Sequence, residues 1–204
     1  MSIKVAISHK TVYKFDRSVK LYPHVFRLRP AAHSRTAIEA YSLKIFPEKH
    51  FINWQQDAFG NYQARVVFPD LVDELRVEVE VIAKLQVINP FDFFIEEYAE
   101  KFPFTYDKTL RKELRPYLEV EGIGLETLKF IESIKVPNNV KTVDFLVLIN
   151  QAVFNALNYN IRMEPGVQTC DETLIRKMGS CRDFSWLLVQ VLRKFGLAAR
   201  FVSG

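Results

Sequence analysis

Apolar and polar residues alternate at two places in residues 1–90. The alternation runs through residues 3–15 and, more cleanly, through residues 74–87, where the apolar positions are Leu75, Val77, Val79, Val81, Leu85 and Val87. A period of two is typical of a β-strand with one buried face. We therefore expect two long, half-buried strands in an antiparallel sheet that keeps one face in water.

Shorter strands are predicted between these two. The candidates lie near residues 24–29, 37–46, 51–56 and 61–68. Gly60-Asn61 supplies a turn between the last two, so FINWQQ and NYQARVVF are expected to form a hairpin. Because helical periodicity is almost absent here, residues 1–90 indicate a small antiparallel β domain of the sandwich type.

The pattern changes at Asn89-Pro90, since proline cannot donate to a strand ladder and biases the residue before it away from helix. Helical patterns follow near residues 107–119 and 125–134. Residues 142–157 are apolar around most of the helical circumference, which predicts a helix buried on several sides. We therefore expect an α+β fold with two domains: residues 1–90 form an N-terminal antiparallel β-sandwich-like domain, and residues 91–204 form a helical one.

Composition and charge exclude several classes of protein. The chain has 204 residues and is 49% hydrophobic, which is enough for sizeable cores. Its formal charge of +4 demands no polyanion, so we expect no nucleic-acid partner. The start is no signal peptide, and no apolar run approaches the roughly 18–20 residues of a membrane span. Together with only two cysteines, this predicts a soluble, cytoplasmic protein that binds no membrane.

The segment GSCRDFSWLLVQVLRKFG carries the main candidate for chemistry. From Phe184 onward, apolar residues recur at the spacing of a helix with one buried face, and Gly196 is a natural stop. Ser180 and Asp183 form the S-x-x-[DE] capping pattern. We therefore predict that Ser180 is the N-cap and that Cys181 lies in the first turn of the helix.

This position favours a reactive thiol at Cys181. The unpaired amides and macrodipole of a helix start favour an anion, and the thiolate is the nucleophilic form of cysteine. Arg182 would add to the effect if it turned toward the sulfur, whereas Asp183 would oppose it. A backbone amide at the same helix start could also stabilise an oxyanion. The alternative is that Cys181 is a small buried hydrophobic residue, as most lone cysteines are.

Cys170 has no comparable setting. It lies in the loop-like segment TCDE, and we interpret it as structural. A disulfide between Cys170 and Cys181 is not expected in a cytosolic protein. We expect no metal site, because the sequence has no C-x-x-C motif and no histidine after His50, and we expect no cofactor.

Gly179, Cys181, Asp183 and Phe184 form a GxCxDF motif, and residues 196–204 read GLAARFVSG. This combination resembles the nucleophile segment of the bacterial transglutaminase-like family, whose members are often described as cysteine peptidases. The resemblance covers nearly the whole chain. Its other segments are IRMEPGVQT, NPFDFFIEEYAEKFPF, VFRLRP and WQQDAFGNYQARVVF.

The resemblance implies that residues 91–204 contain the helical first part of a papain/transglutaminase-like core. It also implies a Cys-His-Asp catalytic triad in which the His activates the thiol and the Asp orients the His. In the family pattern both follow the VSG segment, so we expect this chain to be the front part of a longer protein and inactive by itself. We do not expect any histidine of this chain to act as the catalytic base, because all four lie in the expected β domain: His9, His24, His33 and His50.

Two further expectations concern the reaction. Gln168 precedes the nucleophile, as an oxyanion-donating glutamine does in papain-like enzymes, and is our candidate for that role. Cys181 would attack an amide or peptide carbonyl of a protein or peptide substrate, and hydrolysis of the acyl-thioester is expected from the resemblance. Transfer to an amine is one alternative, and a non-catalytic scaffold that binds a partner is the other. The oligomeric state is left open.

Overall fold

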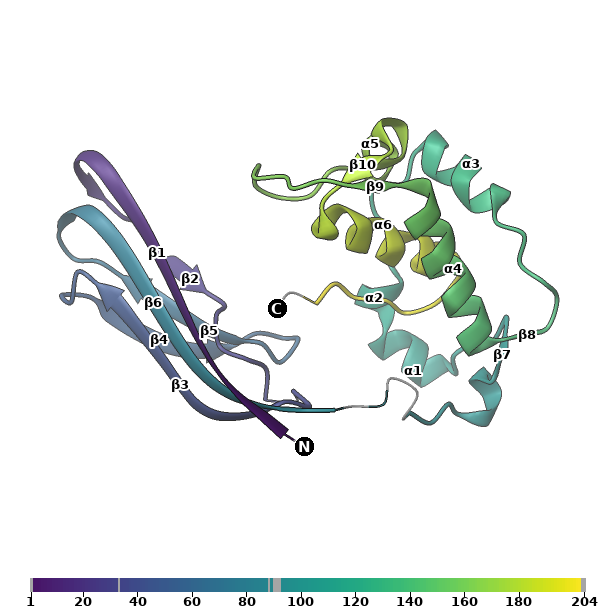
Figure 1. Ribbon diagram of the computed structural model, residues 1–204, viewed down its shortest axis with the longest axis horizontal. Coiled ribbons are helices and arrows are strands. Elements are labelled where there is room, and N and C mark those ends of the chain that lie inside the picture. Colours follow the sequence, from purple (N-terminus) through teal and green to yellow (C-terminus); the bar gives the residue numbers. More distant parts are fainter. Residues whose placement is uncertain (1, 33, 88, 90–92, 203–204) are drawn as a thin grey trace. The chain divides into compact units, whose positions relative to one another are not determined.

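The computed structural model describes residues 2–32, 34–87, 89 and 93–202. The chain divides into two compact units, Met1–Asp92 and Phe93–Gly204 (Figure 1). The first unit is built from strands and the second mainly from helices. The expected α+β fold class is therefore confirmed.

The first sheet of the β unit contains the two long strands that the alternating pattern predicted. Strand β6 (Leu71–Gln86) lies in the middle and pairs antiparallel with β1 (Ser2–Lys20) on one side and with β3 (Ala37–Phe46) on the other. Both neighbours contribute a partner to each central residue: Val77, for example, faces Thr11 in β1 and Ile45 in β3.

The second sheet has the order β2-β5-β4, with β2 at His24–Phe26, β5 at Tyr62–Val67 and β4 at Phe51–Gln56. β4 and β5 form the predicted hairpin. Its turn is fixed by the Asp57 carboxylate, which accepts hydrogen bonds from the backbone N–H groups of Phe59 and Asn61.

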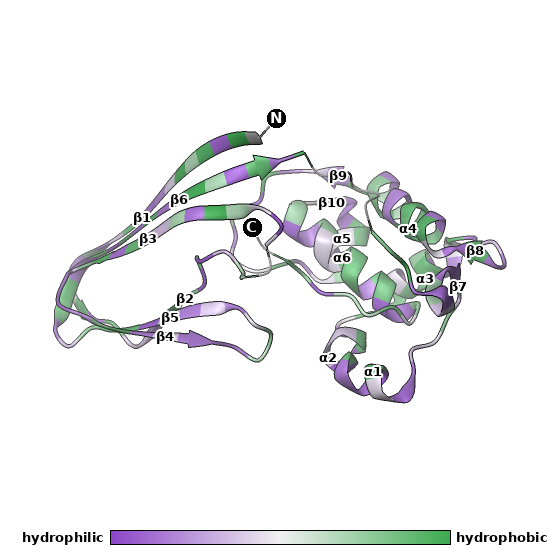
Figure 2. Cartoon of the chain, turned by 90° about the horizontal axis from the view of Figure 1, so that it is seen from below, coloured by the Kyte–Doolittle hydropathy of each residue, from purple (hydrophilic) through white to green (hydrophobic). Residues whose placement is uncertain are grey.

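The two sheets form two layers with a hydrophobic core between them, so the predicted sandwich is confirmed (Figure 2). β6 and β5 supply most of the buried side chains, and the core consists of Ile45, Val66, Phe68, Leu75, Val77 and Val79. Buried and more exposed side chains alternate along the middle of β6, as expected. The expected half-buried face of residues 3–15 is confirmed only in part: Val5 and Phe15 are half-buried and Phe15 packs against this core, whereas Ile3, Ile7 and Tyr13 are each more than half exposed. β1 is an edge strand, and the shorter second sheet does not cover its full length.

The helical unit contains six α-helices within its described residues 93–202: α1 (Lys108–Glu113), α2 (Arg115–Leu118), α3 (Leu125–Ser133), α4 (Thr142–Ala156), α5 (Cys170–Arg176) and α6 (Cys181–Lys194). Short elements connect them: a 3-10 turn η1 (Glu97–Ala99) and the strands β7 (Lys101–Phe102), β8 (Val140–Lys141), β9 (Asn158–Tyr159) and β10 (Met178–Gly179). None of these helices is long and apolar enough to cross a membrane.

The helix predicted near residues 107–119 is divided in two. α1 ends at Glu113, and α2 restarts with Pro116 in its first turn. Proline has no N–H to donate and is well suited to the start of a helix, so it marks the break. The helix predicted over residues 125–134 is confirmed as α3.

The core of the helical unit lies between α4 and α6. Phe145 of α4 stacks on Phe102 with ring centroids 3.7 Å apart, and Leu187 and Val191 of α6 are fully buried beside them. The prediction that α4 is buried on several sides is wrong. Its buried face is the single stripe with Phe145, Ile149 and Val153, whereas its other apolar side chains are exposed at 40% for Leu146, 60% for Val147 and 65% for Phe154. Within the described residues, nothing packs on that second face of the helix closely enough to bury it.

Candidate active site at the start of helix α6

Cys181 is the first residue of α6, and Ser180 is the N-cap, as the capping pattern predicted. The Cys181 side chain is exposed and carries a free thiol. The alternative of a small buried hydrophobic residue is therefore wrong. The position gives a nucleophile both access to solvent and the unpaired amides of a helix start.

The next acidic residue, Asp183, is buried beneath this helix start with 1% of its surface exposed. Its carboxylate accepts hydrogen bonds from the Ser180 N–H at 2.8 Å, the Ser180 hydroxyl at 2.7 Å and the Gln168 N–H at 2.8 Å. Arg162 donates to both carboxylate oxygens at 3.1 Å. Burial by itself would raise the pKa of Asp183, but these donors outweigh it and hold the pKa below its ordinary value.

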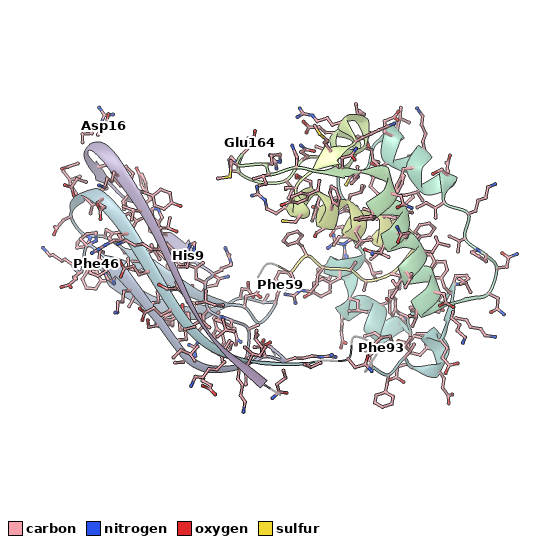
Figure 3. All side chains as sticks on the ribbon, viewed as in Figure 1. His9, Asp16, Phe46, Phe59, Phe93 and Glu164 are labelled. Atoms are coloured by element: carbon pink, nitrogen blue, oxygen red, sulfur yellow. The ribbon has the colours of Figure 1, made fainter. Side chains whose placement is uncertain are left out.

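Arg162 and Arg182 fix the segment that joins β9 to α5. Arg162 also donates to the carbonyl of Gly166, and Arg182 donates to the carbonyls of Arg162 and Glu164. Figure 3 shows Glu164 at the tip of this segment. Neither of the two conditional effects on the thiol is supported by these hydrogen bonds, because Arg182 donates to the segment and Asp183 accepts from Arg162.

A short parallel pair of strands holds the same segment in place. β9 pairs with β10, and the Asn160 N–H donates to the Gly179 carbonyl at 2.9 Å. Gly179 lies so close to the helix that a Cβ atom there would stand 2.9 Å from the Cβ of Asp183. The glycine of the GxCxDF motif is therefore required by space rather than by an unusual backbone angle.

Gln168 lies against the start of α6 through its backbone, which donates to Asp183. Its side chain is largely buried, and its amide oxygen accepts a hydrogen bond from the Thr173 hydroxyl at 3.2 Å. The same hydroxyl also lies 3.0 Å from the Thr169 carbonyl, so the Gln168 side chain is held at the start of α5. The sequence therefore selected two residues, Cys181 and Gln168, that the fold brings to the same helix start.

Cys170 also begins a helix, but it differs from Cys181 in its burial. It is 1% exposed and packs in the core of the helical unit, and burial raises the pKa of its thiol to about 11. The loop expected around it is wrong, because Cys170 is the first residue of α5 with Thr169 as the N-cap. The Thr169 hydroxyl accepts a hydrogen bond from the Glu172 N–H, which is an N-cap bond. The sequence TCDE contains the threonine of this capping pattern, so the helix start could have been predicted from it.

Asp171 has a structural role that the sequence did not reveal. Its carboxylate accepts hydrogen bonds from the backbone N–H groups of Gly124, Glu126 and Thr127 and from the Thr127 hydroxyl. A side chain of α5 thereby caps the start of α3, more than 40 residues earlier in the chain. This contact ties α3 to the element that precedes the nucleophile.

The histidines described by the structure lie in the β unit. The rings of His24 and His50 are hydrogen-bonded to the nearby carbonyls of Tyr22 and Pro47. His9 contacts the Thr11 hydroxyl, and His33 lies outside the described residues. Among the described residues, no cluster of three or more His, Cys, Asp or Glu side chains has the arrangement of a metal site.

Comparison with family models gives two matches. Residues 5–84 match the bacterial transglutaminase-like N-terminal region, and residues 131–204 match the transglutaminase-like superfamily, whose region contains Cys181. The chain belongs to the bacterial transglutaminase-like family. The first match covers most of the β sandwich, and the second covers the helices that form the transglutaminase-like core around α6.

A solved structure supports this fold. The chain is similar to a protein from Cytophaga hutchinsonii described as a "putative cysteine protease", with a TM-score of 0.65 and 14% sequence identity. The match covers 96% of this chain and 66% of that one, so the chain spans about two thirds of the length of its structural neighbour. At this identity the likeness shows a shared fold alone. The search of curated proteins finds no match.

Proposed function

We propose that Cys181 is the nucleophile of a cysteine peptidase or amidase that acts on proteins or peptides. The observation that carries this proposal is the exposed thiol at the first residue of α6. The other side chains of this helix start are engaged: Asp183 is bound by Arg162 and Ser180, and Arg182 by backbone carbonyls. Membership of a thiol-enzyme family adds support.

In this reaction the Cys181 sulfur attacks the carbonyl carbon of an amide, and the thiol proton passes through a base to the leaving amine. A carbon–sulfur bond forms as the carbon–nitrogen bond breaks, which gives an acyl-thioester. Water then attacks the thioester, releases the acid and returns a proton to the sulfur. Hydrogen-bond donors near the helix start stabilise the oxyanion in both steps, and we propose the side-chain amide of Gln168 as one of them.

A base is required, and residues 93–204 contain no histidine. We therefore assign the His and the Asp of the triad to sequence that follows the VSG segment, as in the family pattern. Reading the gene beyond the codon for Gly204 is the first test. We expect a His followed by an Asp, and a reading frame without them would count against the enzyme.

The second test compares labelling with activity. Iodoacetamide is added to the native protein, and the modified cysteines are mapped by mass spectrometry while hydrolysis of a fluorogenic peptide is followed. We expect Cys181 to be modified first and activity to fall in proportion, because Cys170 is buried. Cys181→Ala is expected to abolish hydrolysis, and Cys170→Ala serves as the matched control that keeps it.

The products identify the kind of reaction. Release of the free acid both with and without an added primary amine indicates hydrolysis, whereas incorporation of the amine indicates acyl transfer. Full hydrolysis after complete alkylation of Cys181 would refute a thiol mechanism, whereas the absence of any hydrolysis by the unmodified native protein would favour a scaffold. Hydrolysis by the Cys181→Ala variant would refute it as well.

A further inference from the structure

The β unit contains a pocket of about 580 Å³ beside strand β3. The segment between β2 and β3, the first half of β3, and strands β4 and β5 form its walls, and its lining includes Arg29, Tyr41, Trp54 and Tyr62. All its lining residues belong to the β unit. The volume lies within the range of about 300–1,000 Å³ that is typical of ligand sites.

Three aromatic rings hold the side chain of Arg29 in this pocket. Its guanidinium carbon lies 4.4 Å from the ring centroid of Tyr62 and 5.7 Å from those of Tyr41 and Trp54. These distances are within the range of cation–π contacts. Aromatic rings fix the guanidinium without neutralising its charge, and its N–H donors form a planar fork that matches a carboxylate.

The charge of Arg29 is not compensated by the protein around it. Glu39 is the acidic residue among the described lining residues, and its carboxylate pairs with Lys4 at 2.6 Å. Within the described part of the chain, no carboxylate forms an ion pair with Arg29. The hydroxyl of Tyr41 is buried there without a hydrogen-bond partner among the described residues, so a polar donor is also available.

One wall of the pocket is an open sheet edge. β3 pairs with β6 on one side and is the edge strand of its sheet. Residues 37–41 of this strand line the pocket, and no described backbone group bonds to their free edge. An unpaired edge of this kind accepts an extended peptide as an additional strand. A free phosphate could bind to Arg29, but it has no peptide backbone that could pair with the free edge of β3.

We propose that this pocket binds an extended peptide that carries a carboxylate. The carboxylate lies on the guanidinium fork of Arg29, and the peptide backbone pairs with the free edge of β3. The carboxylate is that of an acidic side chain or of the peptide C-terminus, which present the same group. Peptide binding in this pocket does not require chemistry at Cys181. The binding proposal therefore goes beyond the proposed function, and it can be tested independently of it.

Peptide titrations test the carboxylate. Short peptides of alternating threonine and valine, labelled with a neutral dye that has no carboxylate, are titrated with the whole chain carrying Cys181→Ala, which prevents turnover, and anisotropy is measured. One peptide has a central glutamate and an amidated end, a second has glutamine and an amidated end, and a third has glutamine and a free C-terminal carboxylate. At least one carboxylate peptide is expected to bind about tenfold or more tightly than the uncharged peptide, and which one binds identifies the source. Equal binding of all three would refute the proposal.

Protein variants locate the site. Arg29→Gln is expected to reduce the affinity for the carboxylate peptide to that of the uncharged one, and Arg29→Lys to restore it in part. Arg27→Gln is the matched control, because Arg27 is an exposed arginine that does not line the pocket.

A peptide with N-methyl groups on alternate amides tests the strand pairing. It is expected to bind about tenfold less tightly, since it cannot pair with β3. Equal loss with Arg27→Gln, or full binding of the N-methylated peptide, would overturn the proposal. Circular dichroism checks that each variant is folded.

Discussion

At the scale of single residues, the geometry around Cys181 depends on the ion pair of the partly buried Arg162 with the buried Asp183. Asp183 receives hydrogen bonds from Arg162, Gln168 and Ser180, and so joins the loop before α5 to the helix start. An exposed nucleophile is thereby placed on a rigid support whose own charges are satisfied internally. The pair orients the site without touching a substrate.

Asp183→Asn is expected to destabilise the helical unit by about 2–3 kcal/mol at pH 7, because it removes the charged acceptor of the hydrogen bonds from Arg162 and Ser180 and leaves the partly buried Arg162 with only the exposed Glu164 as an ion-pair partner. The pKa of Asp183 is lowered in the folded state, so its contribution is fully present above its ordinary value of 3.8 and is lost as the pH falls through the folded value. The difference between wild type and variant should therefore shrink below about pH 4. Chemical denaturation of both proteins, followed by circular dichroism at several pH values, measures this difference in unfolding free energy.

The exposed carboxylate of Glu132 in α3 provides the matched control. Glu132→Gln should change the stability by no more than about 0.5 kcal/mol. A difference between wild type and Asp183→Asn that stayed constant from neutral pH to pH 3 would contradict the ionised pair.

At the scale of elements, the helices near the site are fastened to one another at their ends. Asp171 of α5 caps α3, and the β9–β10 pair joins the segment after α4 to the start of α6. Gly124 contributes by its small size, since a Cβ atom there would collide with the Asp171 carboxylate. Polar contacts at helix ends therefore act together with the apolar core in placing these helices.

Asp171→Ala is expected to destabilise the helical unit by about 1–2 kcal/mol, because it removes the acceptor for the N–H groups at the start of α3. The neighbouring variant Glu172→Ala is the matched control. It removes an exposed ion pair with Arg176, which contributes about 0.5 kcal/mol or less. Urea denaturation of both variants measures the two effects, and equal losses would show that Asp171 does not cap α3.

At the scale of the whole molecule, the described residues form two hydrophobic cores, one in each unit. Each core is built from its own elements: strands β3, β5 and β6 in one, and helices α4 and α6 in the other. A substitution in one core should therefore act on the stability of its own unit.

Phe145→Ala is expected to destabilise the helical unit by about 3–5 kcal/mol, since Phe145 is fully buried and stacked on Phe102. Phe154→Ala, on the exposed side of the same helix, should cost far less. The helical transition is followed by circular dichroism, and the β transition by Trp54 fluorescence in a Trp186→Phe background. A shift of the Trp54 transition equal to that of the helices would contradict independent cores.

The sequence by itself determined the features that depend on neighbouring residues. The bounds of β3 and β4, the hairpin at Gly60 and the start of α6 at Cys181 follow from local alternation, turn chemistry and capping. These signals act over a few residues, so they can be read directly from the chain.

Tertiary structure alone decided burial and long-range partners. Ile3, Ile7 and Tyr13 of β1 and the second apolar face of α4 are exposed, because burial depends on what packs against a face and not on its own composition. Apart from the Ser180–Asp183 contact of the capping pattern, the partners of Asp183, Asp171 and Arg29 lie many residues away along the chain. No local pattern specifies which of these distant donors will meet a carboxylate or which ring a guanidinium. Periodicity shows which side of an element is apolar, but only the folded chain shows which charges meet.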